Sequence, residues 1–273
     1  MANDVTLQSL IDELERGCRY HISVLFFGRW GTGPARLDPL HTIHAAPFCD
    51  AVKLRPGGLR RCLRCKALAT EKARRTGRAF GGYCINGVYE YCLPVLRSGS
   101  PMAVVFVGNL ATDPDRICRK TGLSPDDPLF ETLERDLTPV DCPRIGAIVA
   151  SFLETLPEPA ARPPEALSAA VAALKEYADA YYGQDLSLTA LARLYHYNEK
   201  YLGRLFRQQM GLSFHAYLNA RRLRQAAALL ESTNRTVTDI AAAAGFNTVT
   251  YFNRQFRSFY GISPTEYHKK APD

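Results

Sequence analysis

Two stretches in the second half of the chain repeat each other: Tyr201-Leu-Gly-Arg-Leu-Phe-Arg207 and Tyr251-Phe-Asn-Arg-Gln-Phe-Arg257. The same offset of 50 residues relates Gly211-Leu-Ser213 to Gly261-Ile-Ser263, and an offset of 49 relates Leu188-Thr-Ala-Leu-Ala192 to Val237-Thr-Asp-Ile-Ala241. Three blocks in the same order and at nearly one offset indicate a duplicated structural unit.

Each unit is predicted to be two short helices joined by a tight turn, over about 186–209 and 235–259. The glycine Gly245 can adopt the positive φ that a sharp turn between helices needs. The second helix of each unit has an apolar side and a basic, amide-rich side, as in a helix-turn-helix whose second helix lies in the DNA major groove. Between the units, Phe214 to Leu230 is predicted to be a long helix that could hold two reading helices one DNA turn, roughly 34 Å, apart.

The excess of basic residues is concentrated in the part of the chain that carries the repeat. Of the net charge of +7 over 273 residues, residues 161–273 contribute +5 and residues 1–160 only +2. Such an excess favours a partner with a phosphate backbone. All eight cysteines lie in the first part, so the two parts are expected to have different roles. A hydrophobic content of 47% supports packed cores and excludes a disordered or fibrous chain.

A proline-rich segment separates the two parts. Leu156-Pro-Glu-Pro-Ala-Ala-Arg-Pro-Pro164 has four prolines in nine residues, which predicts a semi-rigid linker. We therefore expect one domain over 1–155, a linker over 156–164 and a second domain over 165–273. The apolar run Met102 to Val107 is too short to span a bilayer, and Met1 to Glu15 lacks the pattern of a signal peptide. These features predict a cytoplasmic protein.

Several motifs of the C-terminal half resemble the DNA-binding domain of the AraC/XylS transcription regulators. They are Ala192, the Tyr-Leu-x-Arg-x-Phe block, Gly245-Phe246, Phe252-x-Arg254-x-Phe256 and Gly261-Ile-Ser-Pro-Thr-Glu-Tyr267, within about 166–269. The resemblance implies an all-α domain with two helix-turn-helix units that binds double-stranded promoter DNA, often recruits RNA polymerase and works as a homodimer on paired sites. It implies these DNA-facing residues: Asn198, Glu199, Lys200, Gly203, Arg204, Thr248, Val249, Thr250, Asn253 and Arg254. Arg207 and Arg257 are added as contacts to DNA, with phosphate as suitable a partner as a base.

The N-terminal half mixes strand and helix patterns. Apolar runs bounded by turn residues predict strands at about 21–27, 78–84, 88–96 and 102–110. Helical spacing of apolar residues predicts helices at about 7–15, 58–75, 124–133 and 143–155. The mixture predicts an α+β domain, an antiparallel sheet with helices around it, that is able to enclose a small ligand.

Scattered residues of this half resemble the PocR-type sensory domain, a PAS-like family often found ahead of AraC-type DNA-binding domains. They are Phe48-Cys49, Arg61-Cys-Leu-Arg-Cys65, Tyr83-Cys84, Gly87, Glu90, Pro94-Val95 and Val107-Gly108, within about 8–153. The resemblance implies a sensor of a small organic effector, such as a short diol or another hydrocarbon derivative. Such a ligand needs a few hydrogen-bonding groups within aromatic walls, which favours a pocket among Trp30, Phe48, Tyr83, Glu90, Tyr91 and Asn109.

Four of the cysteines form an acceptable set of ligands for zinc or an iron–sulfur cluster: Cys49, Cys62, Cys65 and Cys84. The spacing of Cys62 and Cys65 lets both sulfurs point the same way, and His41, His44 and Cys92 are substitutes. Two alternatives to a metal or cluster site stay open. Free cysteines often fill protein cores, and structural disulfides are rare in the cytoplasm. The thiols are then inert or line a pocket, or they form a redox switch.

The sequence thus predicts a one-component bacterial transcriptional regulator and not an enzyme, since it shows no nucleophile–base pair, phosphate loop or paired carboxylates. A small-molecule sensor joined to the DNA-binding domain is the first hypothesis, and a metal or redox sensor on the same domain is the second. The third is an enzyme like the DNA-repair protein Ada, which transfers methyl groups to a thiol. The zinc module of Ada has two close cysteine pairs, whereas this chain has one.

Overall fold

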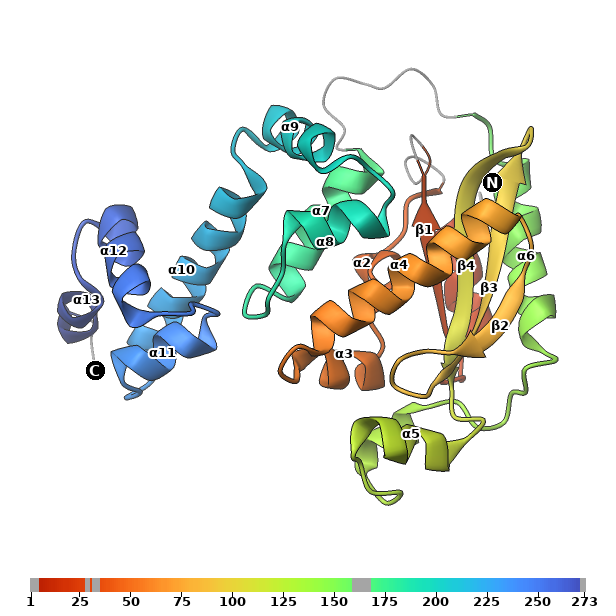
Figure 1. Ribbon diagram of the computed structural model, residues 1–273, viewed down its shortest axis with the longest axis horizontal. Coiled ribbons are helices and arrows are strands. Elements are labelled where there is room, and N and C mark those ends of the chain that lie inside the picture. The colour runs from red at the N-terminus through yellow and green to blue at the C-terminus, as the bar shows by residue number, and fades with distance from the viewer. Residues whose placement is uncertain (1–4, 28–29, 31–34, 159–167, 271–273) are drawn as a thin grey trace.

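The computed structural model describes residues 5–27, 30, 35–158 and 168–270, and the chain forms two halves packed against each other (Figure 1). The N-terminal half contains a four-stranded antiparallel sheet in the order β1-β4-β3-β2. The strands are β1 (His21–Phe26), β2 (Phe80–Tyr83), β3 (Tyr89–Arg97) and β4 (Ser100–Leu110). The described part of the C-terminal half is all helical. These features confirm the expected combination of an α+β and an all-α domain.

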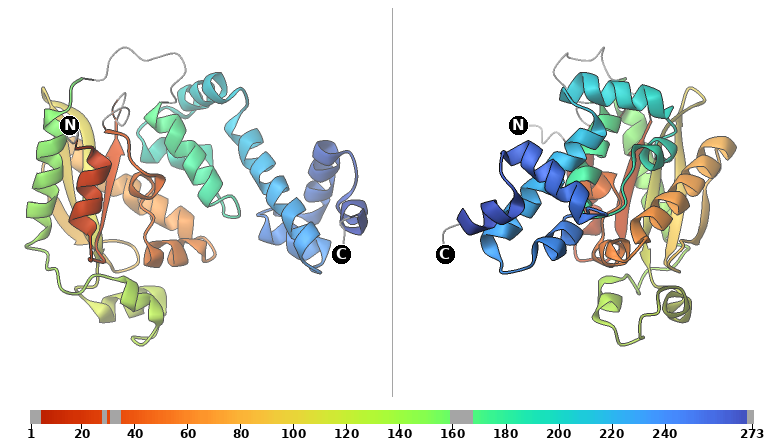
Figure 2. Two further views of the ribbon diagram at one scale, coloured as in Figure 1. Left: turned by 180° about the vertical axis from the view of Figure 1, so that it is seen from behind. Right: turned by 60° about the vertical axis from the view of Figure 1, so that its left-hand side comes forward.

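Helices cover both faces of the sheet, so its central strand β4 is buried on both sides (Figures 1 and 2). Val105 and Val107 pack with α1 (Leu7–Glu15) and α6 (Cys142–Thr155). Val104 and Phe106 pack with α4 (Gly58–Thr76) on the other face. Neighbouring residues of a strand point to opposite faces, which is why residues 102–107 of this strand are all apolar.

The sequence predicted none of the remaining N-terminal helices with the bounds that they have in the structure. They are α2 (Pro39–Thr42), α3 (Pro47–Leu54), α5 (Pro114–Thr121) and a short 3₁₀ turn, η2 (Pro128–Thr132). The sequence predicted a helix over 124–133 and missed α5. Asp113 caps the start of α5 and Gly122, with φ 71°, ends it, whereas Pro128 lacks the N–H group that an α-helix over 124–133 would need for its bond to residue 124.

The C-terminal half carries two helix-turn-helix pairs, one near each end of a long helix (Figures 1 and 2). Its helices are α7 (Ala169–Ala180), α8 (Leu188–Leu194), α9 (Glu199–Met210), α10 (Phe214–Ser232), α11 (Val237–Ala243), α12 (Val249–Tyr260) and α13 (Pro264–Lys270). The pairs are α8 with α9 and α11 with α12, joined by α10, which at 19 residues is about 28 Å long.

The repeated Gly-x-Ser motif ends one helix and starts the next in both units. Gly211 and Gly261 have φ of 77° and 80° and end α9 and α12. Ser213 then caps α10, and the Ser263 side chain accepts the N–H of Glu266 at the start of α13. The sequence repeat is therefore a repeat of stop and start signals.

The two halves share a hydrophobic core. Leu59 and Leu63 of α4 belong to the same buried cluster as Leu191 and Leu194 of α8. Part of the expected linker, residues 159–164, lies outside the described residues, and the boundary at 155 stays a prediction. None of the described helices combines the length and the apolar character that crossing a bilayer requires.

Candidate functional site

The second helix of each pair exposes the basic side that the sequence predicted. Arg204 and Arg207 of α9 are exposed, while Leu202 and Phe206 on the same helix are fully buried. In α12, Arg254, Arg257 and Asn253 are exposed and Phe252 and Phe256 are fully buried. These side chains are exposed in the structure that contains both halves, so the N-terminal half does not cover the basic side of α9 or of α12.

Of the other residues expected to contact DNA, some have exposed side chains, and some cap a helix or allow close packing. Glu199, Lys200 and Thr250 are exposed, and Val249 is half-buried. Asn198 and Thr248 are exposed helix caps whose side chains accept the N–H groups of Tyr201 at 3.2 Å and Tyr251 at 3.3 Å. A Cβ at Gly203 would lie 3.2 Å from Leu188 Cδ2, so the close approach of α8 gives this glycine a packing role.

His196 in the turn between α8 and α9 lies against the N-terminal half. It is half-buried, with Nδ1 3.2 Å from Glu71 Oε2 of α4 and its ring beside Phe27. Burial lowers its pKa. His196 also adopts a left-handed φ of 54°, at the position equivalent to Gly245 in the second pair. The first helix-turn-helix thus contacts the N-terminal domain through its turn.

A pocket with a cavity volume of about 90 Å³, open to solvent, lies in the N-terminal half. It is lined by α4, by Cys49 and Val52 of α3, and by residues of β2, β3 and the turn between these strands. All four cysteines of the expected metal set line it, as do Tyr83 and Glu90 from the expected ligand site.

Four of the six residues expected around the ligand lie elsewhere. Phe48 is completely buried in the core between α3 and η2, and Tyr91 lies against Gly146 of α6, on the opposite face of β3 from Glu90. Asn109 is buried and donates to the carbonyls of Arg19 and Thr132. Trp30 packs on the α6 side, with the guanidinium of Arg97 over its ring. Adjacent residues of a strand cannot both face one pocket, which separates Tyr91 from Glu90.

Three charged or polar side chains meet within this pocket. Lys66 Nζ lies 2.5 Å from Glu90 Oε1 and also 3.4 Å from the centre of the Phe106 ring. Nε2 of His44 lies 3.0 Å from the same carboxylate oxygen. Burial, with the charge of Lys66, lowers the pKa of His44 to about 3, so its ring is neutral and donates to Glu90. The Nδ1 atom of His44 is then a buried acceptor without a partner among the described residues.

The ionised form of Glu90 is favoured although the side chain is buried. Burial opposes its ionisation, but the ammonium group of Lys66 and the hydrogen bond from His44 hold its pKa well below the usual value. Lys66 was not among the residues predicted for the site. Its signal was available, because Lys66 lies on the same face of α4 as the buried residues Leu59, Leu63 and Thr70.

Burial favours the protonated form of three thiols of the pocket, and two of these are hydrogen-bonded. Burial raises the pKa of Cys49, of Cys65 and, to about 12, of Cys84. The sulfur of Cys84 accepts the backbone N–H of Asn86 at 3.4 Å, and Cys65 forms a hydrogen bond with the backbone of Ile85. Among the described residues, no three of these sulfurs come within 4.8 Å of one another.

Both halves of the chain match models of known protein families. The family described as "Sensory domain found in PocR" matches residues 34–180, more than half of the chain, and "Helix-turn-helix domain" matches residues 191–270. The chain is an AraC-type transcriptional regulator with a PocR sensory domain. It belongs to a family of regulators and not of enzymes, so the hypothesis of an Ada-like methyl transferase is wrong.

Curated relatives of this PocR regulator match about a third of its length. An uncharacterized HTH-type transcriptional regulator of Staphylococcus aureus (strain COL) is 33% identical over 97 residues, which are 36% of this chain and 13% of that protein. The uncharacterized HTH-type regulator YisR of Bacillus subtilis (strain 168) is 34% identical over 93 residues, 34% of this chain and 32% of YisR. The chain thus spans about a third or less of these relatives.

Solved structures of DNA-binding domains are similar to more than a third of the regulator. The C-terminal domain of AraT, a response regulator from Geobacillus stearothermophilus, is 32% identical and covers 39% of this chain and 93% of its own, with a TM-score of 0.37. The DNA-binding domain of AdpA, solved in complex with a target DNA, is 25% identical and covers 36% of this chain and 89% of its own, with a TM-score of 0.35.

Proposed function

We propose that the pocket of the PocR domain binds a small organic effector, such as a short diol, and that the bound effector changes the binding of promoter DNA by the two helix-turn-helix pairs. Two acceptors support a ligand with hydroxyl groups: the free Nδ1 of His44 and the carboxylate of Glu90. Phe80 and the protonated thiols provide an apolar wall for the carbon chain.

The observation that carries the proposal is that helix α4 is a wall of the pocket and also a contact of the first helix-turn-helix. Cys62, Lys66 and Ala69 of α4 line the pocket. On the same helix, Leu59 and Leu63 share a core with α8, and Glu71 pairs with His196. A shift of α4 on effector binding would therefore act on α8 and the turn that precedes α9.

A second contact joins the pocket to the C-terminal half. Lys53 of α3 is completely buried, and its Nζ donates to the carbonyl of His44 and, at 2.9 Å, to the hydroxyl of Tyr181 just beyond α7. Tyr181 in turn donates to Asp50 Oδ1 at 2.6 Å. The ring of His44 thus lines the pocket, while its backbone carbonyl takes part in the contact between the halves. A homodimer and recruitment of RNA polymerase stay predictions.

We expect ethane-1,2-diol or propane-1,2-diol to raise the melting temperature of the full chain and to change its affinity for a DNA site selected from a random library. Gly82→Leu should abolish both effects, because Gly82 lines the pocket and a Cβ there meets no atom within 4 Å, so the leucine fills the space. Glu71→Gln should keep the thermal shift but reduce the change in DNA affinity. Thermal denaturation and fluorescence anisotropy measure the two quantities. Equal responses of wild type and Gly82→Leu would refute the proposed pocket.

The second candidate function is sensing of a metal ion or an iron–sulfur cluster by Cys49, Cys62, Cys65 and Cys84. It is favoured by one observation, that the four thiols line a single pocket. A bound metal would replace the thiol protons and require the sulfurs to move closer together. If this function is correct, anaerobically purified protein contains stoichiometric iron or zinc and the Cys62→Ser/Cys65→Ser variant contains none. Metal-free wild-type protein that responds to a diol leaves only the first proposal.

A further inference from the structure

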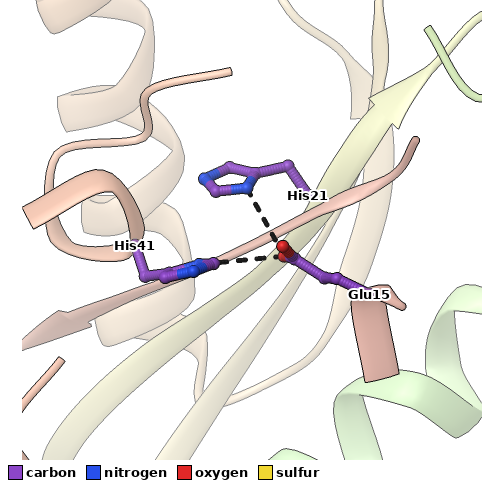
Figure 3. A group of neighbouring side chains, drawn as sticks. All are labelled: Glu15, His21 and His41. Atoms are coloured by element: carbon purple, nitrogen blue, oxygen red, sulfur yellow. Dashed lines mark ion pairs between the residues drawn. The ribbon is translucent and has the colours of Figure 1, made fainter. Parts of the chain in front are cut away.

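A carboxylate and two imidazoles, those of Glu15, His21 and His41, meet in the N-terminal half, and none of the three residues lines the thiol-lined pocket (Figure 3). Glu15 is the last residue of α1, His21 the first of β1, and His41 lies in α2. One ligand atom from each residue lies within 4.8 Å of the other two. The side chains of the two histidines are 9% exposed and that of Glu15 is 20% exposed.

Backbone carbonyls fix the orientation of both rings. Nε2 of His21 contacts the carbonyl oxygen of Leu40 at 3.2 Å, and Nδ1 of His41 contacts that of Ile22 at 2.8 Å. A carbonyl oxygen only accepts hydrogen bonds, so in a neutral ring these nitrogens carry the hydrogens, and Nδ1 of His21 and Nε2 of His41 offer the lone pairs. The His41 contact drawn in Figure 3 runs from Nδ1 to Glu15 Oε1 at 3.7 Å, so a metal ion would be bound by the other nitrogen of this ring. Histidines that bind metals are typically held in this way, with the second ring nitrogen donating to a carbonyl or carboxylate.

The distance between a ring nitrogen of His21 and a carboxylate oxygen of Glu15 is that expected for two ligands of one metal ion. Nδ1 of His21 lies 3.4 Å from Glu15 Oε1, and that oxygen is itself held by the backbone N–H of Ile22 at 2.5 Å. Two ligand atoms of a tetrahedral zinc ion with bonds of about 2.1 Å lie about 3.4 Å apart. The separation in the structure is therefore the one that a shared zinc ion requires.

We propose that Glu15, His21 and His41 bind a divalent transition-metal ion of the zinc type. Two imidazole nitrogens and one carboxylate oxygen suit zinc, nickel, cobalt or iron(II), and three protein ligands leave a fourth position for water. Because the ligands come from α1, β1 and α2, the ion ties three elements of the sensory domain together. The site is separate from the thiol-lined pocket and does not depend on the proposed effector.

The test uses the full chain in a Cys62→Ser/Cys65→Ser background, which removes the close cysteine pair as a competing site. We expect one zinc ion per chain by equilibrium dialysis and a zinc-dependent rise in melting temperature. Glu15→Gln and His41→Gln should each weaken zinc binding at least about 10-fold. Glu15→Gln keeps an oxygen for the N–H of Ile22, and His215→Gln, at an exposed histidine of α10, is the control.

Cobalt(II) in place of zinc identifies the ligands. Binding at the triad gives visible d–d bands without a thiolate-to-cobalt charge-transfer band, and it does so in Cys62→Ser/Cys65→Ser protein as in the wild type. Circular dichroism shows whether each variant is folded, and the spectrum of the cysteine variant tests the site even if a triad variant is not. Undiminished zinc binding by folded Glu15→Gln and His41→Gln protein, or a cobalt spectrum of the Cys62→Ser/Cys65→Ser protein that is dominated by thiolate bands, would overturn the proposal.

Discussion

Lys66→Met is expected to destabilise the sensory domain by about 3–5 kcal/mol, because it leaves the Glu90 carboxylate buried without its cation. Lys66 and Glu90 are 8% and 9% exposed, and Lys66 Nζ lies 2.5 Å from the carboxylate. Once Lys66 is lost, the hydrogen bond of the neutral His44 is the only other interaction described above that favours the ionised form. Urea unfolding followed by circular dichroism measures the change in the free energy of unfolding.

A lysine on the same helix provides the control for this prediction. Lys72 also lies over an aromatic ring, with Nζ 3.9 Å from the centre of Phe80, but it is exposed to solvent. Lys72→Met should therefore cost less than about 1 kcal/mol. Adding Glu90→Gln to Lys66→Met should restore part of the lost stability, since it removes the unpaired charge. Equal stabilities of Lys66→Met and Lys72→Met would show that the buried pair does not support the fold.

Arg254→Ala and Arg204→Ala are expected to weaken binding of a selected DNA site by roughly 1–3 kcal/mol each, a factor of about 5 to 150. Both guanidinium groups project from the second helix of a helix-turn-helix pair on the side opposite its buried residues. In this geometry an arginine can reach the O6 and N7 atoms of guanine. Fluorescence anisotropy at several salt concentrations measures the loss for the selected site and for an unrelated duplex.

The dependence of DNA affinity on salt concentration and on DNA sequence distinguishes contacts to bases from contacts to phosphates. If Arg254 and Arg204 contact bases, their loss lowers the preference for the selected site over the unrelated duplex. Arg257→Ala, if this residue contacts phosphate, weakens both duplexes alike and makes the salt dependence less steep. Arg78→Ala removes the same charge from an exposed position of the sensory domain and should have little effect. DNA binding of Arg204→Ala and Arg254→Ala equal to that of Arg78→Ala would contradict our assignment of the reading helices.

Much of the C-terminal fold could be predicted because local signals set it. Asn198 and Thr248 cap the reading helices, and Gly211 and Gly261 end them, through hydrogen bonds and backbone angles that involve only near neighbours in the chain. The alternation of Leu202 and Phe206 with Arg204 and Arg207 separates the buried side of α9 from its exposed side. Such rules need no knowledge of the rest of the molecule.

The candidate sites were harder to predict because they depend on contacts between distant segments. Cys49 and Cys84 were expected near Cys62 and Cys65, and the structure does place all four around one pocket. The same reasoning chose Phe48 and Trp30 for the ligand site, although aromatic residues fill cores as readily as they line pockets. Residue type alone did not distinguish the two uses.

The amino-acid sequence by itself determined the two helix-turn-helix pairs, the basic side of each reading helix and the mixed α+β character of the first half, because periodicity and capping act over a few residues. Only the tertiary structure decided which face of β3 meets the pocket, that Lys66 pairs with Glu90, and that α4 contacts α8. It also brought Glu15 to His21 and His41. These contacts follow from how sheet and helices pack, and packing joins residues whose separation in the chain carries no signal of their proximity.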